Sequence, residues 1–225
     1  LHLCVRFRQD ISHLDLSWLF ERNDVFDLCA TIAHILWVTL SPEVNMSGMM
    51  SISEVNRMPY EQFISIFGNV VEHCSLCAAA VWCQRPFSDV SQLHEAMSTF
   101  LDQQPLTGKE GVLRLHPDLA GKLAQSGGLT SDSAKEQTSA GLFDMTEKER
   151  QKMNSLNQEY KEKYGFPFVI CARENKKEAI LKGLETRLKN SSEEEALIGV
   201  AEVKKICRLR LLDIVDPSSS TKSVL

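Results

Sequence analysis

The sequence of 225 residues lacks the motifs that mark several large classes of enzyme. It has no glycine-rich phosphate loop, because Gly127-Gly128 stands alone and is typical of a turn. It also has no G-x-S-x-G nucleophile elbow, no HExxH zinc motif and no pyridoxal-phosphate or flavin signature. We therefore expect either a reaction that needs no cofactor and no metal, or a protein without catalytic activity.

An excess of basic residues is also absent. Lysine and arginine number 25 against 30 aspartates and glutamates, for a net charge of −5. Nucleic-acid binding normally requires clustered basic charge, so we expect no nucleic-acid partner. A small anionic substrate is not excluded, since one or two well-placed arginines are enough to bind it.

The cysteines do not form a regular framework of the kind that disulfide-rich secreted proteins carry. Seven of them lie at positions 4, 29, 74, 77, 83, 171 and 207, which favours free thiols in a reducing compartment. Cys74 and Cys77 form one CxxC pair, with His73 and Cys83 nearby. A structural zinc ion needs four convergent ligands, and no second pair follows at suitable spacing. We favour the interpretation that these are small apolar core residues.

No hydrophobic run is long enough to be a clear membrane span. The longest covers residues 25–40, falls short of the roughly 20 residues that a span needs, and contains Asp27 and His34. It also lacks the small-residue cleavage site of a signal peptide. We interpret residues 1–49 as an extra N-terminal segment outside the core domain, with a membrane anchor as the alternative and no membrane partner expected.

From Met50 onward the sequence has the capping residues and apolar spacing of successive helices. The pattern predicts about eight of them in a single compact all-α domain over residues 50–215. The expected starts or ranges are Pro59 to Gly68, Glu72 to Trp82, Asp89 with Gln92, Glu110 to Leu115, Thr130 or Ser131, Thr146 with Glu149, Asn175 to Asn190, and Ser192 with Glu195. Residues 166–171 are expected to be extended and buried, and residues 216–225 to form a disordered tail.

His116 is the first candidate for chemistry. Pro117 follows it and is suited to open a helix, which would place His116 at a helix N-terminus. The positive end of the helix dipole disfavours imidazolium there, and a neutral imidazole can transfer protons near pH 7. The alternative is a histidine that only caps or packs.

Two further features are candidates for function. Ser133, Glu136 and Gln137 have the spacing i, i+3 and i+4, which puts them on one helix face. Such a face could hold a ureido group and assist proton transfer, and the alternative is an ordinary solvated face. Arg210 lies in an apolar seam of the last helix, formed by Ala196, Val200, Val203, Cys207, Arg210 and Ile214. A buried arginine needs a partner, so Arg210 either pairs with Glu136 or presents its guanidinium to a substrate.

Motifs along most of the chain resemble those of the 2-oxo-4-hydroxy-4-carboxy-5-ureidoimidazoline (OHCU) decarboxylases, between about Met50 and Val215. The matching stretches include Phe67-Gly68-Asn69-Val70, Arg85-Pro86-Phe87, Leu115-His116-Pro117-Asp118-Leu119-Ala120-Gly121, Leu129-Thr130 with Ser133, Glu136-Gln137, Ala140-Gly141-Leu142, Leu156-Asn157-Gln158-Glu159-Tyr160, Gly165-Phe166-Pro167-Phe168-Val169-Ile170-Cys171 and Glu202-Val203-Lys204-Lys205-Ile206-Cys207. The resemblance implies an all-α homodimer that decarboxylates OHCU to (S)-allantoin in urate degradation, without a cofactor or metal.

The same resemblance implies the roles of individual residues. It places catalytic functions on His116, Glu136 and Arg210. Substrate contacts fall on Pro117, Ser133, Gln137, Phe168, Val169, Ile170, Cys171, Ala172 and Arg210. Animal relatives often carry a peroxisomal ending like S-K-L, whereas this sequence ends in Ser223-Val224-Leu225 without the central basic residue. The expected compartment is the peroxisome, or otherwise the cytoplasm.

Two other functions are alternatives to a decarboxylase. A helical interaction module that has lost catalysis would keep the core but carry a damaged His116, Glu136 or Arg210, and all three are present. A hydrolase acting on a related ureido compound would need a metal cluster or an activated nucleophile, and the sequence offers neither.

Overall fold

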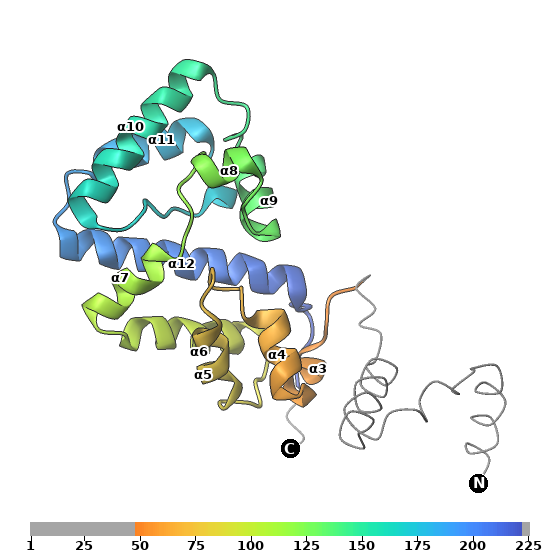
Figure 1. Cartoon of the computed structure of the whole chain (residues 1–225). Coiled ribbons are helices and arrows are strands. Elements are labelled where there is room, and N and C mark those ends of the chain that lie inside the picture. The colour runs from red at the N-terminus through yellow and green to blue at the C-terminus, as the bar shows by residue number, and fades with distance from the viewer. Residues whose placement is uncertain (1–47, 222–225) are drawn as a thin grey trace, which may run out of the picture. The chain divides into compact units, whose positions relative to one another are not determined.

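The computed structural model describes residues 48–221, and from Met49 onward the chain belongs to one compact unit. The predicted all-α class is confirmed, with ten α-helices and one short 3₁₀ helix in this part of the chain (Figure 1). Their bounds are α3 (Ile52–Arg57), α4 (Tyr60–Phe67), α5 (Ser75–Trp82), α6 (Val90–Gln103), α7 (Leu106–Arg114), α8 (Lys122–Ser126), α9 (Ser131–Ser139), α10 (Glu147–Tyr164), η2 (Ala172–Glu174), α11 (Lys177–Arg187) and α12 (Ser192–Ile214).

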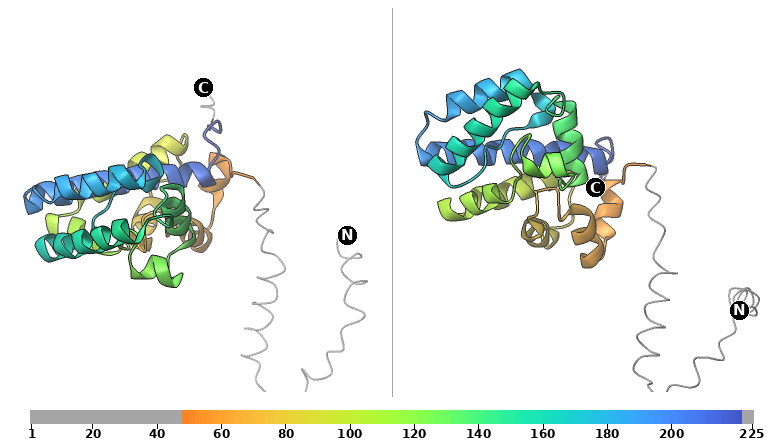
Figure 2. Two further views of the ribbon diagram at one scale, coloured as in Figure 1. Left: turned by 90° about the horizontal axis from the view of Figure 1, so that it is seen from above. Right: turned by 45° about the horizontal axis from the view of Figure 1, so that its top comes forward.

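The last helix, α12, lies at the centre of the fold. Helices α3 to α7 lie on one side of it and α8 to α11 on the other (Figures 1 and 2). The predicted seam is confirmed, since its members from Ala196 to Arg210 are buried and Ile214 is half-buried. Gly199 allows α7 to pack closely, because a Cβ at this position would lie 2.9 Å from a methyl group of Leu113. A helix of 23 residues is about 35 Å long, so α12 reaches both halves of the domain.

Several predicted helix ends are confirmed and others are displaced. Thr130 caps α9, Thr146 and Glu149 form the capping box of α10, and Gly165 ends that helix in the left-handed conformation. The cap predicted at Ser192 is wrong by one residue, since Ser191 pairs with Glu194. The register differs because the next glutamate, Glu195, is completely buried and therefore cannot serve as an exposed capping partner.

Two other predicted starts are also displaced. The helix expected from Glu72 begins at Ser75, since Glu72 is buried and its carboxylate is bound by side chains of other segments. The helix expected after Asn175 begins after Lys176, because the side chain of Asn175 donates instead to the carbonyl of Cys171, 2.9 Å away.

Residues 166–171 are extended and largely buried as predicted, but they pair with no neighbouring strand in the described part of the chain. Side chains satisfy their backbone instead. Arg187 Nη1 donates to the carbonyl of Val169 at 2.8 Å, and Glu202 accepts from the amide of Cys171 at 2.8 Å. Polar side chains on α11 and α12 therefore hold this segment in place.

Residues 216–221 are ordered against the domain, so the predicted disorder of the tail is wrong for this part. The amide of Asp216 donates to Met50, and the amide of Thr221 donates to Ser88. The side chain of Ser219 accepts from the amide of Ile52 at 2.9 Å. Residues 222–225 lie outside the described residues, as do residues 1–47 with their hydrophobic run. Within 48–221 no helix is long and apolar enough to cross a membrane.

The cysteines of the CxxC pair have different environments. Cys77 is buried on α5, whereas Cys74 is half-buried and Cys83 is exposed. No group of three or more potential ligand side chains converges on a metal position within the described residues.

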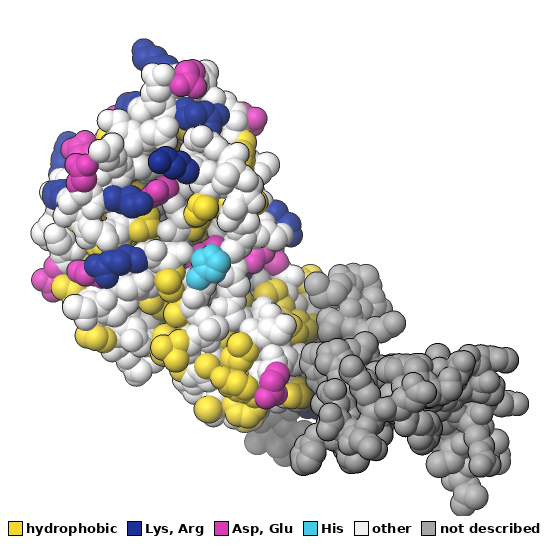
Figure 3. Space-filling model, viewed as in Figure 1, with side chains coloured by type: hydrophobic (Ala, Val, Ile, Leu, Met, Phe, Trp, Pro, Cys, Tyr) yellow, Lys and Arg dark blue, Asp and Glu magenta, His cyan; other side chains and the backbone are white. Residues whose placement is uncertain are grey.

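The surface of the domain differs between its two halves. Apolar side chains such as Tyr60 and Leu76 gather over α4 and α5, while lysines and arginines gather over the half that contains α10 and α11 (Figure 3).

Candidate active site

A cavity between α12, α9 and the segment after α7 brings the predicted site residues together. Its empty space is about 360 Å³ when the open solvent at its mouth is counted, and the space that the centre of a water-sized sphere can occupy is about 30 Å³. Ten of the eleven predicted residues line it, and the exception is Cys171, whose amide is bound by Glu202. The lining consists of His116, Pro117, Leu119, Ser133, Glu136, Gln137, Phe168, Val169, Ile170, Ala172, Ile206 and Arg210. Leu119 and Ile206 add apolar surface that the sequence interpretation missed.

His116 follows the C-terminal end of α7 and does not stand at a helix N-terminus. Pro117 leads into a turn, and the next helix, α8, begins only at Lys122. The backbone amide of His116 donates to Leu113, as in a final helical turn. The predicted helix at Pro117 is therefore wrong, and so is the helix dipole as the reason for a neutral imidazole.

Burial accounts for the neutral state of His116. Removal from water lowers the pKa of His116 to about 4, against the opposing influence of the nearby Glu72 carboxylate. Its Nδ1 lies 3.1 Å from the carbonyl of Val112, which can only accept a hydrogen bond. Nδ1 therefore carries the proton, and Nε2 presents a lone pair. Nε2 is buried and has no partner within the described residues, so it is free to accept a proton from a ligand.

The turn after His116 is held from two helices. The amide of Ala120 donates to Gln137 Oε1 at 2.9 Å, and Asn157 on α10 donates to the carbonyl of Leu119 at 3.0 Å. Ala120 has a φ of 52°, a conformation that non-glycine residues adopt only when surrounding contacts enforce it. Because Gln137 uses its oxygen on this turn, its NH₂ group is the part that can serve a ligand.

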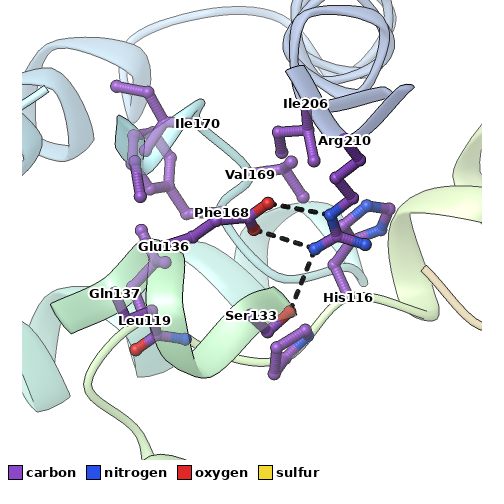
Figure 4. Close-up of a pocket in the computed structure, with 12 residues that line it drawn as sticks. His116, Leu119, Ser133, Glu136, Gln137, Phe168, Val169, Ile170, Ile206 and Arg210 are labelled. Carbon is purple, nitrogen blue, oxygen red and sulfur yellow. Dashed lines mark hydrogen bonds and ion pairs between the residues drawn. The ribbon is translucent and has the colours of Figure 1, made fainter. Parts of the chain in front are cut away.

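Arg210 uses all of its hydrogen-bond donors on protein groups. Nε and Nη2 each lie 2.8 Å from an oxygen of Glu136, an arrangement that is visible with the contact to Ser133 in Figure 4. Nη1 donates to the carbonyl of Asn69 at 3.0 Å and to Glu72 at 2.7 Å, and Nη2 also reaches Ser133 Oγ at 3.3 Å. A guanidinium has five N–H groups, so none is free in this state. Of the two predicted alternatives, the internal pair with Glu136 is the one observed.

Glu72 is a member of the cluster that the sequence interpretation did not identify. It is only 1% exposed and accepts from Thr130 at 2.8 Å and Ser133 at 3.0 Å in addition to Arg210. Burial would raise the pKa of Glu72, but the charge of Arg210 and these hydrogen bonds outweigh it and lower the pKa. The sequence interpretation placed Glu72 at the start of a helix, and no local pattern relates it to Arg210, 138 positions away.

The wall opposite α9 provides backbone donors. Within the described residues, the amides of Val169, Ile170 and Ala172 have no hydrogen-bond acceptor, and all three residues line the cavity. Such N–H groups can stabilise negative charge that develops on a bound ligand. The cavity thus combines a proton acceptor on His116 with donors on the opposite wall and on Gln137.

Comparisons with known proteins agree on one family. A family model described as OHCU decarboxylase matches residues 56–212. An OHCU decarboxylase of Xenopus laevis is 48% identical over 165 residues, which cover 73% of this chain and 94% of the relative. One from Amia calva is 49% identical over 174 residues, covering 77% of this chain and 99% of the relative.

Two solved structures have the same fold. A crystal structure of (S)-allantoin synthase superposes with a TM-score of 0.59 at 25% identity, covering 74% of this chain and 54% of that one, so the match spans about half of that protein. A crystal structure of OHCU decarboxylase in the presence of (S)-allantoin gives a TM-score of 0.52 at 25% identity, covering 64% of this chain and 92% of the other.

Proposed function

The chain belongs to the OHCU decarboxylase family, and on this premise we propose that it converts OHCU to (S)-allantoin and CO₂ in urate degradation. The observation that carries the proposal is the buried and unpartnered Nε2 of His116, a residue that lines the cavity together with Glu136, Gln137 and Arg210. The assembled positions of His116, Glu136 and Arg210 also argue against a module that has lost catalysis.

The substrate can carry its own electron sink. The bond from ring carbon C4 to the carboxylate breaks as CO₂ leaves, and the electron pair passes toward the adjacent ring C=N, whose nitrogen takes up a proton. The 4-hydroxyl then loses its proton to become a carbonyl, and C5 receives a proton on one face. Since the ring accepts the electrons, the proposed reaction requires no cofactor and no metal.

His116 is suited to both proton transfers at the 4-hydroxyl and at C5. In its neutral form Nε2 accepts the hydroxyl proton, and the resulting imidazolium can return a proton to C5. A pKa of about 4 makes His116 a weak base, so its imidazolium is a strong acid that gives up the proton readily. His116 lines one wall of the cavity, and protonation from that wall alone would reach a single face of the ring, as (S)-allantoin requires.

The other lining groups are suited to orientation and charge stabilisation. We assign the NH₂ group of Gln137 to a carbonyl of the ureido arm and the amides of residues 168–172, except the occupied amide of Cys171, to the ring oxygens. Glu136 is oriented by Arg210 and offers its remaining lone pairs to substrate N–H or hydroxyl groups. Arg210 contributes its positive charge near the developing negative charge.

The test generates OHCU in situ from urate with uricase and hydroxyisourate hydrolase, and follows the optical activity of allantoin by circular dichroism. The protein should be compared before and after EDTA treatment and as the His116→Asn variant. Loss of the proton-transfer group should reduce kcat by about 10²- to 10⁴-fold. EDTA should have no effect.

The outcomes separate the candidate functions. Rapid formation of (S)-allantoin that depends on His116 supports the decarboxylase. If allantoin forms only slowly and as a racemate, the chain is a catalytically silent relative, and the proposal is wrong. Sensitivity to EDTA would instead contradict a reaction that needs no metal.

We also propose a homodimer and a peroxisomal location, both of which rest on the resemblance to the family. Sedimentation analysis of the chain from Met50 onward tests the dimer, and a monomer at micromolar concentration would contradict it. The location is tested by imaging a fluorescent fusion of the protein together with a peroxisomal marker, and a diffuse cytoplasmic signal would contradict it.

A further inference from the structure

Glu72 belongs to the charge cluster of the site but does not line the cavity. It precedes His73, which is one of two non-glycine residues with positive φ in the described chain, at 49°. The other, Ala120, lies in the turn after His116. Backbone conformations of this kind are unfavourable unless surrounding contacts enforce them. The segment around Glu72 is therefore held in a specific conformation beside the site.

The two carboxylates lie at different edges of the same guanidinium. Glu136 occupies the edge formed by Nε and Nη2, whereas Glu72 lies 2.7 Å from Nη1. Arg210 is 3% exposed, and Glu72 is 1% exposed. The buried Arg210 therefore has two anionic partners: Glu136, which lines the cavity, and Glu72, which does not.

A single partner would make the site unstable during the reaction. If Glu136 were the only counter-ion of Arg210, any step that protonated Glu136 or turned it toward the substrate would leave a buried guanidinium unpaired. Leaving a buried charge without its partner is strongly unfavourable. A second carboxylate that stays ionised removes this penalty and keeps Arg210 in position.

We propose that Glu72 is the permanent counter-ion of Arg210, a positioning residue that holds the guanidinium while Glu136 exchanges protons or hydrogen bonds with the substrate. This role rests on the proposed decarboxylation. Glu72 lies outside the cavity lining, so it positions Arg210 and is not a catalytic residue, and its charge also acts on His116 by raising the pKa of the imidazole.

The surroundings of the two glutamates fit this division. Glu72 accepts from Thr130 and Ser133 as well as Arg210, and these contacts help to lower its pKa and keep it ionised. Glu136 has only Arg210 as a side-chain partner within the described residues. Glu136 also borders a second cleft, lined by Asp132, Lys135, Ser139, Arg173 and Asp213.

The kinetics of two variants distinguish whether the site depends on the negative charge of Glu72 or on the size of its side chain. Glu72→Gln keeps the size of the side chain and removes its charge, whereas Glu72→Asp keeps the charge and shortens the side chain. We expect Glu72→Gln to lower kcat by on the order of 10- to 100-fold with a smaller change in KM, and Glu72→Asp to recover most of that loss. If Glu72→Gln is as active as the wild type, or more active than Glu72→Asp, the inference is overturned.

A second measurement does not depend on turnover. The Nη groups of Arg210 should give ¹⁵N NMR signals protected from exchange in the wild type, Glu72→Gln and Glu136→Gln, because in each variant one carboxylate still binds an Nη group, Glu136 at Nη2 or Glu72 at Nη1. The signals should be lost only in the double variant. Loss in Glu136→Gln alone, or retention in the double variant, would contradict a second counter-ion.

Glu202→Gln provides the matched control. It removes another mostly buried carboxylate from α12, whose partners are the amide of Cys171 and the side chain of Lys205. Its Arg210 signal should match that of the wild type, and a loss would mean that the signal reports general loosening. A wild type without OHCU turnover would refute the proposed function, whereas the NMR series would still decide the inference about Glu72.

Discussion

Two buried clusters of arginine and glutamate lie along α12, and they differ in how their charges are balanced. The site cluster consists of Arg210, Glu136, Glu72 and the neutral His116. The packing cluster consists of Arg187, Glu195, Tyr160 and Asn190, with Arg187 Nε and Asn190 Nδ2 each 2.7 Å from Glu195 and the hydroxyl of Tyr160 also donating to it. The packing cluster has one cation and one anion, whereas the site cluster has two carboxylates for one guanidinium.

The comparison shows that burial of charge does not by itself identify a site. Arg187 supports the cavity from outside, since it donates to the carbonyl of Val169 and lies 4.5 Å from the ring centroid of Phe168. The site cluster differs through the unpartnered Nε2 of His116 and its second carboxylate. An unpaired proton acceptor and an excess of carboxylates over guanidinium groups, both next to a cavity, therefore distinguish the site cluster from the packing cluster.

The largest expected difference between the clusters concerns loss of their arginines. Arg210→Met leaves two buried carboxylates beside each other and should lower the free energy of unfolding by about 3–5 kcal/mol. Arg187→Met leaves one carboxylate that Tyr160 and Asn190 still bind, so its effect should be smaller, about 2 kcal/mol. Urea unfolding near pH 7 measures both values. Equal losses would show that the second carboxylate has no energetic consequence.

The second prediction concerns pH, because His116 belongs only to the site cluster. The pKa of His116 is about 4 in the folded state and about 6.5 when unfolded, so the unfolded chain binds the proton more tightly. The free energy of unfolding should therefore fall as pH drops from about 6.5 to about 4, by up to about 3 kcal/mol from this residue.

His116→Gln is the control for this dependence, since other titrating groups remain. The variant should lose less stability than the wild type over the same pH range, as measured by urea unfolding at each pH. Parallel curves for the two proteins would mean that His116 is not buried in its neutral form.

The smallest expected effect concerns Ser191, the N-cap residue of α12, which fixes where this helix begins relative to Glu195 of the packing cluster. Ser191→Ala removes the hydroxyl that caps α12 and should cost about 1 kcal/mol in unfolding free energy. Ser192→Ala changes an exposed first-turn residue and should alter stability by less than about 0.5 kcal/mol. Thermal or urea unfolding compares them, and the reverse order would favour the cap predicted from the sequence at Ser192.

Patterns within single helices were predictable because they depend on near neighbours. The spacing of Ser133, Glu136 and Gln137 implied a common face, and all three are buried on α9. The seam on α12 identified Arg210 as a buried cation that needs a partner, and Glu136 is that partner. The motif around His116 located the catalytic candidate even though the helix expected after it does not form.

The sequence alone therefore determined the helical class, the seam of α12 and the need to neutralise Arg210, since periodicity and the cost of burying charge follow from residue type. Only the tertiary structure decided that Glu72 is a second counter-ion, because it lies 138 positions from Arg210 and no local pattern relates them. It also decided that burial keeps His116 neutral and that Nε2 is left unpaired. Both depend on which segments exclude water and supply partners, and long-range packing sets this.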